Sequence, residues 1–149
     1  MTNYKEALIR KAKEEDCEQI FNLIVELAKN HNQTAYVRTN EPEIFDSEKK
    51  MGVIVAEIGS QLIGYLSYTW NYSIWSGNEH VNIDDVFILE EFRGQKVGKM
   101  LKANKIALEN NISKIRWEVE IDNDSAIKFY ESLGAKYLQK GIFKWNILS

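Results

Sequence analysis

A chain of 149 residues is long enough to bury a core, and we predict a single domain over residues 1–149. Hydrophobic residues make up 44% and charged residues 28% of it, as in ordinary soluble globular proteins. The net charge of −3 gives no basic face for nucleic acid, and no apolar run is long enough to span a membrane. The charged N-terminal stretch is unlike a signal peptide, so we expect a cytoplasmic location. The single cysteine, Cys17, lies on an apolar helix face, where packing is the expected role.

Apolar spacing predicts alternating strands and helices along the whole chain. Residues 7–10 begin a strand, and apolar positions three and four apart predict a helix from about Glu14 to Asn30. Residues 31–43 are polar and contain Pro42, so we expect a loop and then a short helix. The later elements are expected in this order: a hairpin of strands 53–58 and 61–70, a loop over 71–79, a strand over 83–89, a helix through 97–108, a strand over 115–121, a helix capped by Asn123, and strands over 136–138 and 142–147.

A strand, a basic glycine-containing loop and the start of a helix follow one another between residues 82 and 110. The loop and the first helical turn carry Arg93, Lys96 and Lys99. The first N–H groups of a helix have no partner within it, and the helix dipole favours negative charge there. This segment therefore predicts a site for a phosphate or pyrophosphate group.

The spacing of this loop excludes the commonest nucleotide-binding loops. Gly94 and Gly98 are too close for a P-loop, and Lys99 is not followed by Ser or Thr. A dinucleotide fingerprint needs three glycines after an early strand, whereas this loop has two, late in the chain. Residues 93–98, RGQKVG, instead resemble the RGxGxG pyrophosphate loop of the GCN5-related N-acetyltransferase family. Lys96 stands where that family usually has its middle glycine.

A second stretch resembles the other signature of the same family, NxxAxx[FY]YxxxG. Asn123, Ala126, Tyr130 and Gly134 occupy its defined positions. From the residues alone, Asn123 suits the N-cap of a helix and Gly134 the position just past its last turn. Two signatures in the family's order make the chain similar to this family over essentially its whole length.

The resemblance implies an α/β (α+β mixed) fold, with one mixed sheet of six or seven strands and helices on both faces. In that family two central strands splay apart and acyl-CoA lies in the cleft. The resemblance further implies that the strand lines the pantetheine arm and that the loop grips the pyrophosphate. The residues expected to contact acetyl-CoA are Val86, Phe87, Ile88, Arg93, Gly94, Gln95, Lys96, Val97, Gly98, Lys99, Asn123 and Tyr130.

Acetyl transfer to an amine needs removal of a proton from an ammonium of pKa about 10.4, polarisation of the thioester and a proton for the leaving thiolate. Tyr130 is the candidate proton donor, because the family places this tyrosine near the CoA sulfur; simple packing of its ring is the alternative. Asp84 is the candidate base or amine anchor, or else a strand-end charge with a lysine or backbone partner. Neighbouring strand residues point to opposite faces, so we expect at most one of Asp84 and Asp85 in a given cleft.

Several segments narrow the resemblance to the spermidine/spermine and diamine acetyltransferases, namely residues 7–29, 73–77 and 83–88. That group usually has glutamate at the position of Asp84 and an acidic residue near the position of His31. It also implies a homodimer. The residues expected to bind the amine are Asp84, Asp85, His31, Trp75 and Glu120.

The leading hypothesis is an acetyl-CoA-dependent N-acetyltransferase that acts on a primary amine of a small cationic substrate, a diamine or polyamine, by direct attack in a ternary complex. An aminoglycoside or amino-acid N-acetyltransferase is the alternative within the same class. A non-catalytic acyl-CoA-binding domain is the alternative from another class, and Lys96 in the loop keeps it open. With two histidines, His31 and His80, far apart in the chain, we expect no metal site.

Overall fold

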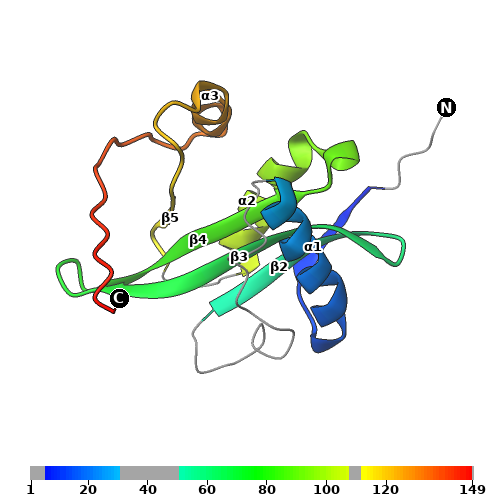
Figure 1. Cartoon of the computed structure of the whole chain (residues 1–149). Helices are drawn as coiled ribbons and strands as arrows, with labels where there is room; N and C mark the ends of the chain where they lie inside the picture. The colour runs from blue at the N-terminus through cyan, green and yellow to red at the C-terminus, as the bar shows by residue number, and fades with distance from the viewer. Residues whose placement is uncertain (1–5, 31–50, 108–111, 149) are drawn as a thin grey trace. The chain divides into compact units, whose positions relative to one another are not determined.

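The computed structural model describes residues 6–30, 51–107 and 112–148, and it divides the chain into two compact units, Met1–Trp117 and Glu118–Ser149. Within these residues the first unit holds one sheet and two α-helices, and the second holds one α-helix and an extended C-terminal segment (Figure 1). In the described residues no helix combines the length and the apolar character needed to cross a membrane.

The sheet of the first unit is mixed and has five strands in the order β1-β2-β3-β4-β5. Neighbouring strands are antiparallel from β1 to β4, and β5 runs parallel to β4. The predicted hairpin around Gly59 is confirmed, and the positive φ of 64° at Gly59 explains why a glycine stands in this tight turn. The strands are β1 (Leu8–Lys11), β2 (Met51–Ile58), β3 (Gln61–Ser73), β4 (Asn78–Ile88) and β5 (Ile115–Trp117).

One helix covers each face of this sheet, as predicted. The helices are α1 (Cys17–Asn30), which follows the short 3-10 helix η1 (Glu14–Asp16), and α2 (Gln95–Ala107), which follows η5 (Glu90–Phe92). Ile20 and Leu23 of α1 pack with one core cluster of the sheet, whereas Met100 of α2 packs with the other. Neighbouring strand residues such as Ile54 and Val55 belong to opposite clusters, because strand side chains alternate between faces. Both faces are therefore buried, and β2 reads as an almost continuous apolar run.

Arg10 ties the N-terminal elements to the sheet. Its guanidinium contacts a carboxylate oxygen of Asp16 at 2.7 Å and one of Glu57 at 2.8 Å. Asp16 also accepts a hydrogen bond from the backbone N–H of Lys13 at 2.7 Å. Because these partners come from β1, η1 and β2, the cluster fixes the start of α1 against the edge of the sheet.

The prediction of a loop over residues 71–79 is wrong. Strand β3 continues to Ser73 and β4 begins at Asn78, and these two residues pair across the hairpin. A turn joins them, in which the N–H of Gly77 donates to the carbonyl of Ser73 at 2.8 Å. Backbone hydrogen bonds between the two strands do not depend on apolar side chains, so the polar composition of this stretch misled the prediction.

The second unit confirms the predicted capped helix, α3 (Asp124–Ser132). The side chain of Asn123 accepts a hydrogen bond from the N–H of Ala126 at 3.3 Å, and Gly134 follows the helix with φ of 99°. The strand predicted over residues 115–121 stops at Trp117.

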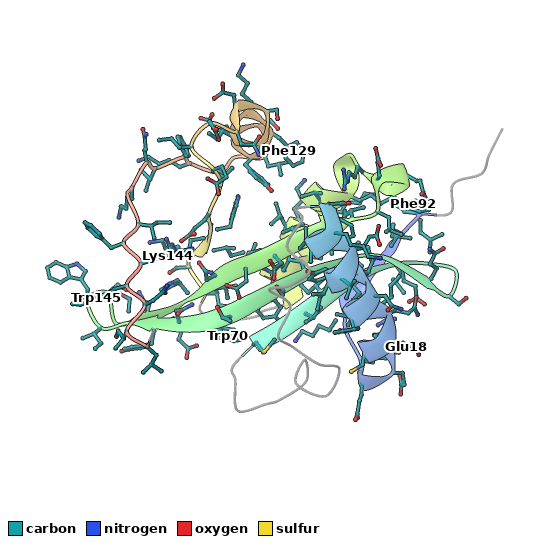
Figure 2. All side chains as sticks on the ribbon, in the orientation of Figure 1. Glu18, Trp70, Phe92, Phe129, Lys144 and Trp145 are labelled. Atoms are coloured by element: carbon teal, nitrogen blue, oxygen red, sulfur yellow. The ribbon has the colours of Figure 1, made fainter. Side chains whose placement is uncertain are left out.

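The strands predicted over residues 136–138 and 142–147 are absent from the described structure. Figure 2 shows the indole of Trp145 projecting from this segment, and 88% of the residue is exposed. An alternating apolar pattern becomes a strand only where a neighbouring strand takes its backbone hydrogen bonds, and here the described residues supply none. The sheet accordingly has five strands in this structure, and not the six or seven that we expected.

Candidate functional site

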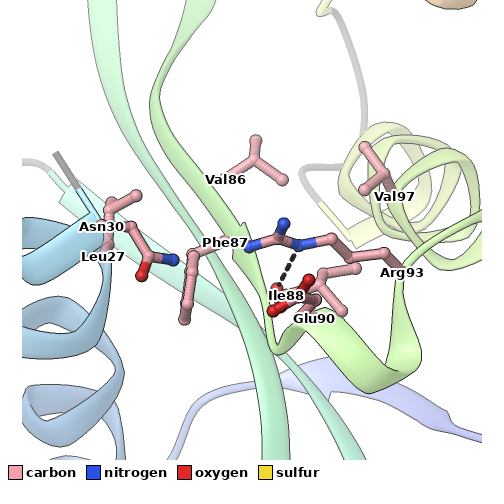
Figure 3. Close-up of a pocket in the computed structure, with 8 residues that line it drawn as sticks. All are labelled: Leu27, Asn30, Val86, Phe87, Ile88, Glu90, Arg93 and Val97. Atoms are coloured by element: carbon pink, nitrogen blue, oxygen red, sulfur yellow. Dashed lines mark hydrogen bonds between the residues drawn. The ribbon is translucent and has the colours of Figure 1, made fainter.

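A pocket of about 450 Å³ lies in the first unit, where the end of α1, strand β4 and the start of α2 meet (Figure 3). It brings together five of the residues expected to contact the cofactor, namely Val86, Phe87, Ile88, Arg93 and Val97. The sequence analysis missed its three other lining residues, which are Leu27, Asn30 and Glu90. Leu27 carried a weak signal as part of the apolar stripe of α1, whereas nothing in the sequence marked the other two.

The side chain of Arg93 reaches across this pocket toward β4 (Figure 3). Its Nε donates a hydrogen bond to the carbonyl oxygen of Ile88 at 3.0 Å, and its guanidinium carbon lies 5.9 Å from the centroid of the Phe87 ring. The second contact has the geometry of a cation–π interaction. The pocket therefore combines apolar side chains with the guanidinium of Arg93, the carboxylate of Glu90 and the amide of Asn30.

The loop before α2 presents a helix start to the same pocket. Helix α2 begins at Gln95, and Val97 of its first turn lines the pocket. Gly94 has φ of 120°, a conformation that other residues rarely adopt, so the loop needs glycine at this position. The N–H groups of this first turn lack partners within the helix and make it suitable for an anion.

The two lysines of the loop lie near an N-terminal carboxylate. Lys99 Nζ contacts Glu6 Oε1 at 2.6 Å. The hydrogen bond and charge of Lys99, with a smaller contribution from Lys96, lower the pKa of Glu6. Such an exposed ion pair is weak in water, so Lys99 can exchange this partner for a phosphate at little cost.

A β-bulge interrupts β4 at the acidic residues. Ser67 of β3 pairs with Asp85, and the next residue, Tyr68, pairs with Ile83. Asp84 is thus an extra residue without a partner on β3. A bulge of this kind bends its strand and changes the direction of the side chains that follow.

The bulge places both acidic residues on one face, so the expectation that only one of them faces a given cleft is wrong. Ile83 and Val86, on either side of the pair, both pack with the core cluster that α2 covers. Asp84 and Asp85 therefore both lie on the opposite face, the one that α1 covers. Asn82, two residues before Asp84, donates a hydrogen bond to its carboxylate at 2.9 Å, as expected for neighbours on one face.

The surroundings of Asp85 favour its protonated form. Burial raises the pKa of this carboxyl group, the nearby charge of Asp84 raises it further, and a hydrogen bond from Ser67 Oγ at 3.1 Å opposes both effects. Although the residue keeps accessible surface, neighbouring atoms crowd its carboxyl group, and this crowding makes the charged form costly. Two carboxylates on one face form a site that attracts a cation and can hold a proton.

Strand β4 joins this acidic pair to the pocket. Among the described residues β5 pairs with β4 only from Val81 to Ile83, so the β5-facing edge of β4 has no strand partner from Asp84 onward. Residues 86–88 on that stretch line the pocket. An elongated ligand can therefore lie along the edge of β4, with an anionic end at α2 and a reactive end at the carboxylates.

The remaining predicted site residues lie elsewhere. Trp75 is at the turn between β3 and β4 and is 98% exposed, so it is not packed among the described side chains. Glu120 and Asn123 belong to the second unit, where Asn123 caps α3. His31 lies outside the described residues.

Tyr130 lies in α3 of the second unit and is half-buried. Its ring meets that of Phe129 edge-on, with centroids 5.4 Å apart. Burial raises the pKa of its hydroxyl group, so the phenol keeps its proton over a wide pH range. In the described part of the chain no three His, Cys, Asp or Glu side chains gather in a way that could hold a metal ion.

Comparison with known proteins identifies the family. Residues 24–135 match the model of the acetyltransferase (GNAT) family. Thialysine N-epsilon-acetyltransferase of Sus scrofa is 33% identical over 145 residues, which cover 88% of this chain and 85% of that protein. Spermidine/spermine N(1)-acetyltransferase-like protein 1 of Homo sapiens is 26% identical over 140 residues, covering 85% of this chain but 20% of that protein.

Solved structures agree on the fold. An aminoglycoside acetyltransferase from an uncultured soil metagenomic sample, solved in complex with sisomicin, matches with a TM-score of 0.79 at 16% identity. The match covers 96% of this chain and 97% of that one. At so low an identity the likeness supports the fold alone.

Proposed function

The chain belongs to the acetyltransferase (GNAT) family, and we propose that it transfers an acetyl group from acetyl-CoA to a primary amine of a small cationic substrate, a diamine or polyamine. The amine attacks the thioester directly, without a covalent enzyme intermediate. The observation that carries this proposal is the pair of carboxylates at the bulge of β4, on the strand that also lines the pocket.

The carboxylate pair meets the first requirement of the reaction. An alkyl ammonium with a pKa of about 10.4 must lose a proton before it can attack. Asp84 anchors the ammonium by its charge. Asp85 takes the proton, because its raised pKa brings the carboxyl group closer to the pH at which the enzyme works. A second ammonium on the same substrate adds to the attraction.

The pocket supplies the place for acetyl-CoA. The pantetheine arm lies along the unpaired edge of β4, where backbone N–H and C=O groups replace the hydrogen bonds of water. The pyrophosphate lies at the first turn of α2, with Arg93 and the loop lysines beside it. Arg93 must leave the carbonyl of Ile88 to reach this position, which frees that carbonyl for the pantetheine amide.

Tyr130 is the proposed proton donor to the leaving thiolate. It occupies the tyrosine position of the second signature, and its raised pKa keeps it protonated until the thiolate forms. The transfer of this proton requires the phenol to be held beside the leaving thiolate, so proximity supplies part of the rate. The enzyme acts as a homodimer, which size-exclusion chromatography with light scattering would test.

A second substrate class is favoured by one observation. The relative that is 33% identical is named for acetylation of the N-epsilon group of thialysine, an amino acid. A lysine-like amino acid presents the same primary ammonium at the end of a flexible chain as a diamine does, so the carboxylate pair suits both. The aminoglycoside alternative has structural likeness as its only support.

A thiol-release assay with acetyl-CoA separates these readings. The amines to compare are putrescine, spermidine, lysine, thialysine and sisomicin, each at several concentrations. We expect the highest kcat/KM with spermidine or putrescine. A clear preference for thialysine would transfer the proposal to amino acids, and a preference for sisomicin would support the aminoglycoside alternative. Tight binding of CoA without turnover of any amine would contradict the proposed reaction.

A further inference from the structure

Tyr65 has a buried hydroxyl group without a partner. The residue is 1% exposed, lies on β3, and packs in the core cluster that α1 covers. Its hydroxyl oxygen is buried and makes no hydrogen bond to any of the residues that the structure describes. A buried hydroxyl without a partner costs free energy that phenylalanine at the same position would avoid. Such a group needs an explanation, and a partner engaged during function is one.

Asp85 is the candidate for this partner. Tyr65 pairs with Phe87 across the two strands, and Ser67 pairs with Asp85, so Tyr65 and Asp85 are diagonal neighbours on one face of the sheet. Diagonal neighbours are within reach of a long aromatic side chain. The negative charge of Asp85 adds to burial in raising the pKa of the Tyr65 hydroxyl, which agrees with their closeness.

Asp85 has an oxygen available for this bond. Ser67 Oγ donates to Oδ2 at 3.1 Å, and within the described ranges no hydrogen bond to Oδ1 is found. Asp84 is the charged neighbour on β4, and α1 contributes Ile20 and Leu23, which are apolar, to the cluster around the tyrosine ring. Among these groups the Tyr65 hydroxyl is the one suited to donate to Oδ1.

We propose that Tyr65 is a positioning residue for Asp85, whose Oδ1 accepts a hydrogen bond from the Tyr65 hydroxyl while Oδ2 accepts one from Ser67. This inference rests on the proposed role of Asp85 in taking the proton of the substrate amine. Two donors from β3 hold the carboxylate in one orientation. The proton moves from the substrate ammonium to Asp85, and Tyr65 keeps its own proton throughout. A small rotation of the Asp85 side chain makes the bond, and the bond is present in the free enzyme as well as with substrate.

The test is Tyr65→Phe, which removes one oxygen and keeps the ring, with Tyr68→Phe as the matched control. Tyr68 is also a buried tyrosine of β3, but it packs in the other core cluster, on the opposite face. NMR titration of the Asp85 side-chain carboxyl carbon reports the pair without any need for turnover. A hydrogen bond to a charged group is worth about one pKa unit or more, so we expect Tyr65→Phe to raise the pKa of Asp85 by about one.

Kinetics supply the second readout. We expect Tyr65→Phe to lower kcat about tenfold with little change in the KM for acetyl-CoA, and to move the acidic limb of the kcat/KM profile to higher pH. In an Asp85→Ala background the same change should cause no further loss, because no acceptor for the Tyr65 hydroxyl remains at that position. Tyr68→Phe should leave all of these quantities as in the wild type.

The proposal is overturned if Tyr65→Phe raises the melting temperature and leaves both the pKa of Asp85 and kcat unchanged, since the hydroxyl is then only an unsatisfied core group. Should this variant fail to fold, the pair is tested in Asp85→Ala through the Cζ resonance of Tyr65, and an unchanged resonance contradicts the proposed bond. If the wild type acetylates no amine, the proposed function fails, while the titration of Asp85 still decides the role of Tyr65.

Discussion

Gly64 marks a close approach of β3 to the stretch of β4 that lines the pocket. It pairs with Ile88, and a Cβ at this position would lie 2.8 Å from the carbonyl oxygen of Phe87 and 2.9 Å from Cγ1 of Ile88. Ordinary van der Waals contact begins at 3.4 Å, so Gly64→Ala requires β3 and β4 to move apart by about 0.6 Å. The carbonyl oxygen belongs to the backbone and cannot rotate away as a side chain would.

The cost of this change is worked from the contacts. Overpacking costs about 1–3 kcal/mol, and a clash with backbone puts Gly64→Ala in the upper part of that range, about 2–3 kcal/mol. For a chain of this length the melting temperature should fall by roughly 6–9 °C. Because Phe87 and Ile88 line the pocket, the displaced strand should also raise the KM for acetyl-CoA several-fold, more than the KM for the amine.

Thermal unfolding followed by circular dichroism, together with steady-state kinetics, checks both effects. Gly141→Ala is the matched control, since a Cβ there meets no heavy atom within 4 Å, and its melting temperature should stay within about 2 °C of the wild type. Wild-type stability and an unchanged KM for acetyl-CoA in Gly64→Ala would refute the reasoning about the strand approach.

Four further predictions concern single side chains. Asp16→Asn should cost about 2–3 kcal/mol in urea unfolding, because it breaks the bonds of 2.7 and 3.0 Å from Arg10; a cost below about 0.5 kcal/mol would contradict this. The hydrogen bond from Arg10 lowers the pKa of Asp16, so this contribution is complete above the unfolded pKa near 4 and is lost as the pH falls through the lowered value. Asn104→Leu should stabilise the fold by about 1–2 kcal/mol, since this fully buried amide makes no hydrogen bond to the described residues; a less stable variant would contradict this. Because the pKa of Asp85 is raised, ionisation of this group destabilises the folded protein as the pH rises through that value. Asp85→Asn should therefore have a higher melting temperature than the wild type at pH 8 but not at pH 3, and equal melting temperatures of the two proteins at both pH values would contradict this. Tyr130→Phe should lower kcat more than it raises the KM for acetyl-CoA, whereas an unchanged kcat removes Tyr130 from the acid role.

Local features of the fold were predictable from the sequence. The cap at Asn123, the glycine at Gly134 and the helix after the basic loop depend on a few neighbouring residues, and the structure shows all three. The two signatures likewise identified the family that the comparison confirms. These features need no knowledge of which strands pair.

The parts that the sequence did not predict depend on pairing between distant residues. The bulge at Asp84 exists only because β3 and β4 pair in different registers before and after it, so the common face of Asp84 and Asp85 was predicted wrongly. Leu27 and Asn30 reach the pocket only through the packing of α1 on the sheet. In the sequence Tyr65 looks like any other residue of an apolar strand. Its buried hydroxyl, without a partner among the described residues, can be recognised only in the folded chain.

The central claim is that the carboxylate pair at the bulge of β4 handles the substrate amine and not the cofactor. The most direct measurement compares amine kcat/KM with the Kd for CoA in the double variant Asp84→Asn/Asp85→Asn. Glu18→Gln serves as control, because it removes an exposed carboxylate at the end of α1 opposite to Leu27 and Asn30. We predict that the double variant loses at least about 100-fold in amine kcat/KM, as for removal of a general base, while the Kd for CoA stays as in the control. Equal losses in both quantities, or an unchanged kcat/KM, would contradict the assignment.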